Sequence, residues 1–242
     1  MKHLVIKCMS LSSKGKRLCN EDFLSVSGGA YIICDGVGGS AKGEIASKLA
    51  CEAISNYFLH LSHGIPQKQD VMDAIINAED AFTKYVAKHP ESNGMATTLA
   101  LLHIFGPVAM MAHAGDSRIY HVRNGTILYQ TKDHSLINDL IDAGYIREEE
   151  AKWHTQRSVI TRAIQGKHNP ALADVKYIYD IRQNDFFILC TDGLLEGIDN
   201  HFIEKSFVCN AELGDLVKRI NSMCEENADD NFSAIFIEIL SS

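Results

Sequence analysis

The sequence predicts an α+β fold, in which strands and helices occupy separate stretches of the chain. Three apolar segments rich in β-branched residues, 97–104, 108–114 and 118–122, follow one another closely and predict neighbouring strands. The pair Asn124-Gly125 separates the last of them from a further strand-like segment, TILYQT. Because both central residues of a two-residue hairpin turn need positive φ, Asn-Gly predicts a hairpin and therefore antiparallel pairing.

The N-terminal half is expected to contain a strand followed by two helices. Residues 30–34 form a short apolar run that ends at an Asp-Gly pair, which suits a buried strand. Apolar residues at helical spacing predict helices over residues 43–61 and 70–88, and Asp70 is placed to cap the second helix. Helices segregated from the later strands support α+β layering.

The C-terminal half contains two helical and three strand-like segments. Helices are expected at 136–143 and 211–226, and strands at 175–181, 186–190 and 232–240. No internal repeat, low-complexity tract or linker divides the chain. We therefore expect a single domain over residues 1–242.

Composition excludes several classes of partner. The chain has 242 residues, of which 46% are hydrophobic and 22% charged, as is ordinary for a folded soluble protein. A net charge of −8 argues against nucleic acid or an anionic membrane as a partner held by charge. Seven scattered cysteines without a C-x-x-C pair, and the lack of a recognisable targeting segment, favour free thiols in the cytoplasm.

Acidic residues stand next to several predicted strands. Asp35, Asp116 and Asp192 end apolar runs, and Asp230 lies just before the last strand. Each acid alone is more often part of a turn or a cap. Carboxylates gathered together without cations would suffer mutual repulsion and desolvation. Hard oxygen ligands of this kind suit Mg²⁺ or Mn²⁺, and two such ions together are typical of phosphate chemistry.

The stretch RLCNED places Arg17 shortly before the acidic pair Glu21-Asp22. An arginine fork donates two parallel hydrogen bonds to phosphate, so Arg17 is a candidate phosphate clamp beside acids that order a metal. A solvated turn explains the same residues equally well.

The residues after the first predicted strand allow three interpretations. Asp35-Gly36 puts a carboxylate and an unhindered carbonyl at the rim of a sheet, where both can reach a cation. An ordinary tight turn is the plain alternative. Residues 36–41 also fit G-x-G-x-x-A, a dinucleotide-binding fingerprint. That fold requires a second strand ending in an acid about 20 residues later, whereas here one helix leads into another.

Eight motifs together resemble the PPM family, the metal-dependent serine/threonine protein phosphatases of the protein phosphatase 2C type. They occur in the family's order and span nearly the whole chain: RLCNED, CDGVGG, MATTLAL, AHAGDSRIY, TKDHSL, SVITRAI, FFILCTDGLLEG and ADDNFSAI. The resemblance implies a four-layer sandwich, with two central antiparallel β-sheets flanked by helices on each side. The stretch 134–157 resembles the flap-like insert of bacterial members.

The resemblance also implies a role for each matching residue. Asp35 would bridge two Mn²⁺ or Mg²⁺ ions, with the Gly36 carbonyl on one ion and Asp192 and Asp230 on the other. Glu21 and Asp22 would ligate the metals directly or order metal-bound water. Arg17 would hold the substrate phosphate, and Asp116, with Asp192, would match a third, weaker metal site. Arg17, Asp35 and Asp192 would form the catalytic set.

The implied activity is hydrolysis of phosphoserine and phosphothreonine monoesters on proteins by a hydroxide held between two cations. Such an enzyme would reverse a serine/threonine kinase, and we expect a cytoplasmic monomer whose partners are that kinase and its targets. Val37 stands where some family members carry a histidine that protonates the leaving oxygen, so the general acid is unassigned. Two other classes stay open: an inactive phosphoprotein-binding module on this fold, and a nucleotide-binding oxidoreductase.

Overall fold

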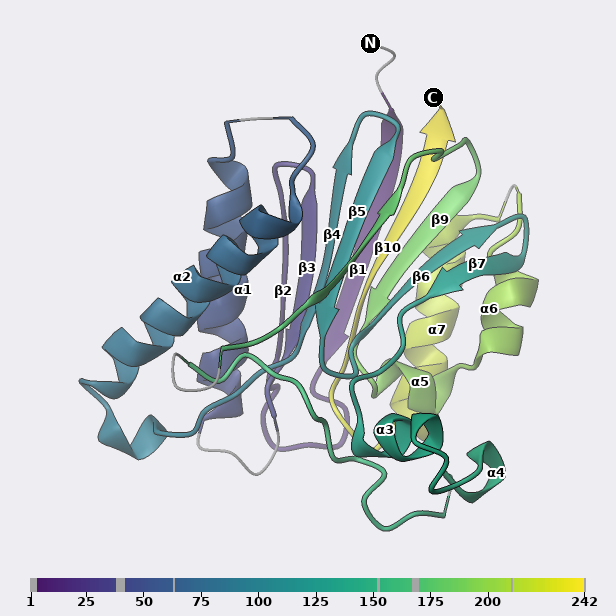
Figure 1. Cartoon of the computed structure of the whole chain (residues 1–242). Coiled ribbons are helices and arrows are strands. Elements are labelled where there is room, and N and C mark those ends of the chain that lie inside the picture. Colours follow the sequence, from purple (N-terminus) through teal and green to yellow (C-terminus); the bar gives the residue numbers. More distant parts are fainter. Residues whose placement is uncertain are drawn as a thin grey trace.

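Figure 1 shows the computed structural model of the chain, in which residues 4–37, 42–62, 64–151, 153–166, 170–209 and 211–241 are described. Two antiparallel sheets of five strands each form its centre. The first sheet has the order β1 (Val5–Ser13), β10 (Phe232–Ser241), β9 (Asp185–Cys190), β6 (Arg118–Arg123) and β7 (Thr126–Gln130). The second has the order β2 (Asp22–Ser27), β3 (Ala30–Asp35), β4 (Leu99–Phe105), β5 (Val108–Ala114) and β8 (Asp174–Ile178).

Helices cover the outer face of each sheet and complete four layers (Figure 1). Two long helices, α1 (Gly43–Leu59) and α2 (Lys68–Val86), pack on the second sheet. Three others pack on the first: α5 (Leu194–Gly197), α6 (Asn200–Ser206) and α7 (Leu213–Asn227). The connections carry η1 (Pro90–Ser92), α3 (Leu136–Asp142) and α4 (Glu148–Ala151). The expected four-layer α+β sandwich is confirmed. Among the described residues, no helix combines the length and the apolar character needed to cross a bilayer.

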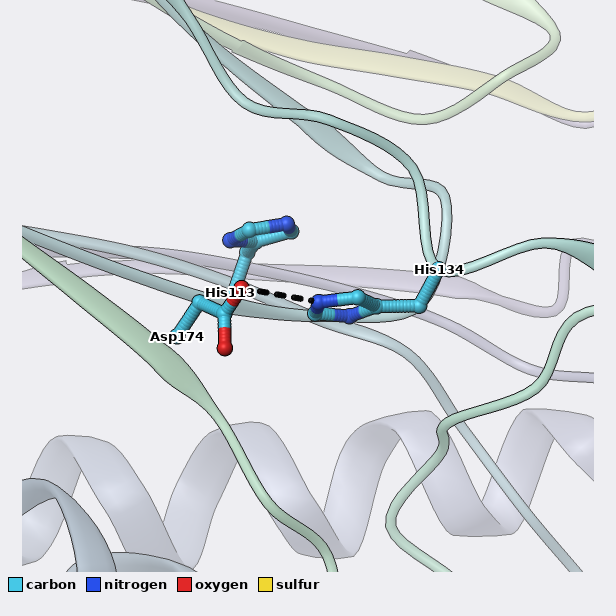
Figure 2. A group of neighbouring side chains, drawn as sticks. All are labelled: His113, His134 and Asp174. Carbon is cyan, nitrogen blue, oxygen red and sulfur yellow. Dashed lines mark hydrogen bonds and ion pairs between the residues drawn. The ribbon is translucent and has the colours of Figure 1, made fainter. Parts of the chain in front are cut away.

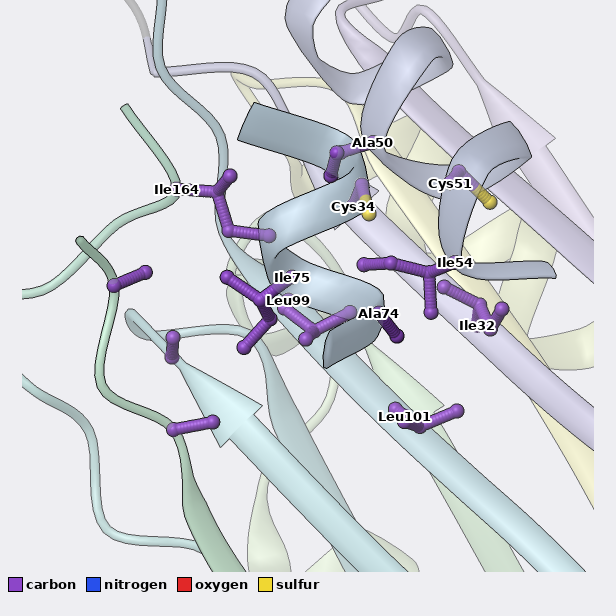
Figure 3. Packing of buried hydrophobic residues seen from close by; sticks show 14 of the residues in the cluster. Ile32, Cys34, Ala50, Cys51, Ile54, Ala74, Ile75, Leu99, Leu101 and Ile164 are labelled. Atoms are coloured by element: carbon purple, nitrogen blue, oxygen red, sulfur yellow. The ribbon is translucent and has the colours of Figure 1, made fainter. Parts of the chain in front are cut away.

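The inner strands are continuous apolar runs because both of their faces are covered. Strand β3 turns Ile32 toward the helices and Ile33 toward the other sheet. Alternate side chains point to opposite faces of a strand, so a strand buried on both faces has no outward polar position. Figure 3 shows the helix-facing core, to which Ile54 of α1, Ile75 of α2 and Leu101 of β4 contribute.

The sequence prediction missed the first two strands. Strand β1, VIKCMSLSS, lies at the edge of its sheet and is only partly buried, so its apolar pattern is weak. Its position depends on pairing with β10 at the far end of the chain, a contact that local sequence cannot reveal. The predicted cap of α2 was also wrong. The N-cap is Gln67, and Asp70 accepts a hydrogen bond from the Gln67 N–H (2.6 Å) within a capping box.

Strand directions bring the predicted site residues to one end of the sandwich. Strands β3 and β5 both run antiparallel to β4, so the ends that lead to Asp35 and Asp116 lie at the same edge. Strand β9 runs antiparallel to β10, which puts Asp192, after β9, beside Asp230, before β10. Helices α3 and α4 lie at this same end (Figure 1).

Candidate metal centre

An open cleft of about 650 Å³ lies where these strand ends meet. Seven of the eight predicted site residues line it: Arg17, Glu21, Asp35, Gly36, Asp116, Asp192 and Asp230. The eighth, Asp22, is buried. Convergence of residues so distant in the chain is what a shared binding site requires.

The residues that directly follow the predicted insert reach this cleft. Its two ends are held together by a bridge between Ser135 and Ile160 and by the Leu136 N–H, which donates to the Val159 carbonyl (2.8 Å). Ile160 and the neighbouring Ser158 line the cleft. The insert is therefore anchored at its base beside the site.

Two threonines hold the backbone of Asp35. The Asp35 N–H donates to Thr98 Oγ1 (3.0 Å), while the Thr98 N–H and the Thr97 hydroxyl donate to the Asp35 carbonyl (2.8 and 2.7 Å). Thr98 Oγ1 also lies 2.7 Å from the hydroxyl oxygen of Ser117, which follows Asp116. The motif MATTLAL thus links the backbones that carry these two acids.

Gly36 lets the start of α1 approach the site. A Cβ at this position would lie 2.4 Å from the Gly43 backbone, far closer than real Cβ atoms come. The Gly36 N–H donates to the Glu21 carbonyl (3.0 Å). A Cβ at Gly43 would in turn lie 3.0 Å from the Glu21 carboxylate. Only glycine at position 36 permits this packing of β3, α1 and the Glu21 loop.

The backbones of the turns that carry Asp192 and Asp230 also pack closely against each other. A Cβ on Gly193 would lie 2.0 Å from the Asn231 carbonyl oxygen. On the other side, Gly15 has φ +53°, and its Cβ would lie 2.3 Å from the Asp230 carbonyl oxygen. The backbone of residues 230–231 is therefore enclosed between two glycines.

Asn231 joins the N-terminal loop to this turn. Its side-chain carbonyl accepts from the Glu21 N–H (2.8 Å), and its amide donates to the carbonyls of Lys14 and Cys19 (2.8 and 2.9 Å). Three hydrogen bonds from one side chain thus position the loop that bears Arg17 and Glu21. Asn231 is buried, with 6% of its surface exposed, so these bonds replace its contacts with water.

Asp22 is a buried carboxylate in which one of the two oxygens accepts a hydrogen bond from a described residue. Its Oδ2 accepts from the Thr191 hydroxyl (3.0 Å), but its buried Oδ1 has no hydrogen-bond partner in the described structure. Burial raises the pKa of Asp22 to about 7, against the effect of its hydrogen bonds and with added repulsion from Asp192 and Asp230. Burial of an ionised carboxylate is costly unless a cation or a hydrogen-bond donor lies beside it.

Mutual repulsion affects the other acids as well. The pKa of Asp35 is raised well above its usual range, first by burial and then by four carboxylates: Asp22, Asp192, Asp116 and Asp230. Burial, followed by the charge of Asp192, raises the pKa of Asp116 to about 7. The pKa of Asp192 is raised by partial burial and by the charges of Asp230 and Glu196. These acids lie close enough together to oppose one another's ionisation.

Arg17 offers one positive charge to this cluster. Its Nη2 donates to Asp230 Oδ2 (2.7 Å), and this contact, more than any other, raises the pKa of the guanidinium. More than half of the Arg17 side chain remains exposed in the cleft wall. One cation cannot balance Glu21, Asp35, Asp116, Asp192 and Asp230. The donor set, all hard oxygen and electron-rich, fits divalent cations such as Mg²⁺ or Mn²⁺.

A second group of potential ligands lies outside the cleft lining (Figure 2). His113, His134 and Asp174 each offer one atom within 4.8 Å of the others. The two imidazole planes are nearly parallel (9°) with ring centres 4.4 Å apart, so their in-plane lone pairs cannot both aim at one ion. His134 Nδ1 accepts from the Gly115 N–H (3.2 Å), which leaves Nε2 as the protonated nitrogen facing Asp174 (3.3 Å). This group fits a hydrogen-bonded support for Gly115 better than a metal site.

Sequence reasoning assigned no role to several residues that shape the site. Thr98 and Asn231 position the acids through their side chains, and Glu196 lines the cleft. All three belong to motifs that were recognised, yet their function depends on partners distant in the chain. The fingerprint alternative at residues 36–41 is not supported, because the described chain runs from β3 through α1 and α2 without an intervening strand. Residues 38–41 themselves lie outside the described residues.

Comparison with known proteins gives consistent matches. The sequence profile of the protein phosphatase 2C family matches residues 12–234. The serine/threonine protein phosphatase PstP of Mycobacterium tuberculosis is 34% identical over 205 residues, which cover 83% of this chain and 38% of PstP. The chain thus spans well under two thirds of that relative's length.

Two solved structures extend the match to three dimensions. The crystal structure of M. tuberculosis PstP/Ppp has a TM-score of 0.87 and 28% identity, and the match covers 98% of this chain and 100% of that one. A structure of the PstP catalytic domain in complex with two manganese ions has a TM-score of 0.83 and 27% identity. That match covers 99% of this chain and 100% of that one.

Proposed function

This chain belongs to the protein phosphatase 2C family, and on that premise we propose that it hydrolyses phosphoserine and phosphothreonine monoesters on proteins. The observation that carries the proposal is the convergence of Asp35, Asp116, Asp192 and Asp230 on one cleft that also contains Arg17. The two manganese ions bound by the related PstP catalytic domain support a metal-dependent reaction.

The acids would hold two divalent cations, Mn²⁺ or Mg²⁺. The carboxylates of Asp35, Asp192 and Asp230 and the carbonyl of Gly36 would hold them. Paired cations supply a water molecule activated for attack on phosphorus and neutralise charge on the phosphoryl oxygens. Without these ions, Arg17 alone would have to offset the repulsion among the carboxylates.

The remaining side chains would orient the reactants. Glu21, at the rim of the cleft, and Asp22, with its unpartnered oxygen, would accept hydrogen bonds from ordered water or contact a cation directly. Arg17 would exchange its contact with Asp230 for the substrate phosphate. Val37 lines the cleft with an aliphatic side chain that has no proton to give, so another group must protonate the leaving oxygen.

Several broader features belong to the same proposal. We propose one domain over residues 1–242, with 134–157 as a flap-like insert, acting as a cytoplasmic monomer that reverses a serine/threonine kinase. The free state of all seven cysteines supports a reducing compartment.

The decisive test is hydrolysis of a phosphothreonine peptide by the purified protein. We expect phosphate release with added Mn²⁺ and none after treatment with EDTA. An inactive phosphoprotein-binding module would bind the peptide without releasing phosphate under either condition, and that result would overturn the proposal.

Arg17→Ala should raise KM for the phosphopeptide by about 10- to 100-fold, because a charge-assisted hydrogen bond to phosphate contributes about 1.5–3 kcal/mol. Manganese affinity, measured by calorimetry, should change much less. The matched control is Lys16→Ala, since Lys16 pairs with Asp229 and neither residue lines the cleft. An unchanged KM in Arg17→Ala would remove this residue from substrate binding.

Asp116→Ala should lower activity by about tenfold if Asp116, with Asp192, holds a third and weaker cation. The two tighter ions should still bind, because Asp35, Asp192 and Asp230 are untouched. Titration calorimetry with Mn²⁺ distinguishes these cases. Loss of the tight binding phase would contradict a role confined to a third ion.

A further inference from the structure

A second hollow of about 570 Å³ lies beside the catalytic cleft, between α5, α6 and α7. Glu196 lines both hollows, so the two are neighbours at this residue. We call the second hollow the α5–α7 groove. Its walls include the apolar side chains of Leu195, Ile198, Phe202 and Met223.

Two exposed cations line this groove. Lys205 and Arg219 are exposed, and neither forms an ion pair with any residue that the structure describes. Arg219 instead lies over the Phe202 ring, 5.1 Å from its centre, which holds the guanidinium against the apolar wall.

The groove's two acids are already hydrogen-bonded. Asp199 accepts from the Phe202 N–H (2.7 Å) as the cap of α6, and Glu196 accepts from the Asp229 N–H (2.6 Å). Lys205 and Arg219 are thus the charged side chains of the groove that have no ion pair or hydrogen bond with the described residues. They leave the groove complementary to a ligand that is acidic and partly apolar.

We propose that the α5–α7 groove binds the part of a phosphoprotein substrate that flanks the phosphorylated residue, with preference for acidic and apolar side chains there. The proposal rests on the proposed phosphatase function, and it names the substrate class that this function would favour. A chain whose phosphate lies in the cleft would continue past Glu196 into the groove, since Glu196 lines both hollows. Lys205 and Arg219 would then pair with carboxylates, while Phe202 and Met223 would contact apolar side chains.

The test uses two phosphothreonine peptides that are identical except for their flanks, one with Asp, Glu and Leu, the other with Lys and Ala. Wild-type kcat/KM should be about tenfold higher for the acidic peptide, equivalent to about 1.4 kcal/mol. The double substitution Lys205→Glu with Arg219→Glu should abolish that preference and leave hydrolysis of a small aryl phosphate unchanged. The matched control is Lys218→Glu, because Lys218 is exposed on α7 but pairs with Asp215 and does not line the groove.

Binding can be separated from hydrolysis by fluorescence polarisation with the unphosphorylated acidic peptide. We expect its Kd to rise about tenfold in the double variant and to rise with added salt, as it should for charge pairing at a surface. Equal kcat/KM for both peptides, with no difference in Kd between wild type and variant, would overturn the groove proposal. Hydrolysis of neither peptide nor aryl phosphate would instead overturn the proposed function, and the binding measurement would still decide the groove.

Discussion

Asp35→Asn is expected to reduce Mn²⁺-dependent hydrolysis of an aryl phosphate on the order of a thousandfold or more, since removing one preorganised charge-stabilising group already costs about 10²–10³ in rate. The substitution keeps the shape of the side chain and removes the negative charge that would bridge the cations. The backbone contacts of residue 35 with Thr97 and Thr98 do not involve the carboxylate and should persist. Initial rates at saturating Mn²⁺ measure the effect, with Asp215→Asn on the exposed face of α7 as the control.

In the absence of metal, Asp35→Asn should make the folded protein more stable at neutral pH, although it lowers activity when metal is present. The pKa of Asp35 is raised in the folded protein above its ordinary 3.8. Above pH 3.8 and below the folded-state pKa, the folded protein therefore holds a proton that the unfolded chain has lost. The free energy of unfolding of metal-free wild type should therefore fall as the pH rises from about 4 toward neutrality. Asp35→Asn should lose part of this dependence and have the higher Tm at pH 7. A lower Tm in the variant would mean that Asp35 supports the fold rather than a metal.

Asn231→Ala is expected to lower both stability and activity. The substitution removes three hydrogen bonds and leaves the Glu21 N–H and the carbonyls of Lys14 and Cys19 without their partner. Since each net hydrogen bond contributes about 0.5–1.5 kcal/mol, a loss of about 2–4 kcal/mol in the free energy of unfolding is expected.

Activity should fall with Asn231→Ala because the same bonds position the loop that carries Arg17. We expect a decrease in kcat/KM of about 100-fold, comparable to the effect of misplacing a catalytic group by about 1 Å. Asn227→Ala is the control, since Asn227 is exposed at the end of α7 and, within the described part of the chain, its amide donates to the Met223 carbonyl alone (2.7 Å). Urea denaturation and steady-state kinetics on both variants separate the two effects. Wild-type kinetics in a folded Asn231→Ala protein would show that loop position does not limit catalysis.

Local sequence was sufficient where an element's own residues dictate its structure. The helices α1 and α2 and the strands β3, β5 and β9 have strong periodicity or continuous apolar runs, and each lies close to its predicted position. The edge strand β1 was missed because its apolar pattern is weak and the strand is stabilised by pairing with β10, which is distant in the sequence. Asp70 was assigned to the wrong capping position, because the capping box depends on a reciprocal contact with Gln67.

The same contrast applies to the candidate site. The sequence alone predicted which residues would carry the chemistry: acids and glycines at strand ends, in an order that resembles one family. Only the tertiary structure decided that seven of these residues share a cleft, that Asp22 is buried beneath it, and that Asn231 ties the N-terminal loop in place. The physical reason is that composition and residue spacing determine local structure, which depends on residues near one another in the sequence. Repulsion between carboxylates and contact between glycine backbones arise only after folding brings distant segments within a few ångströms of each other.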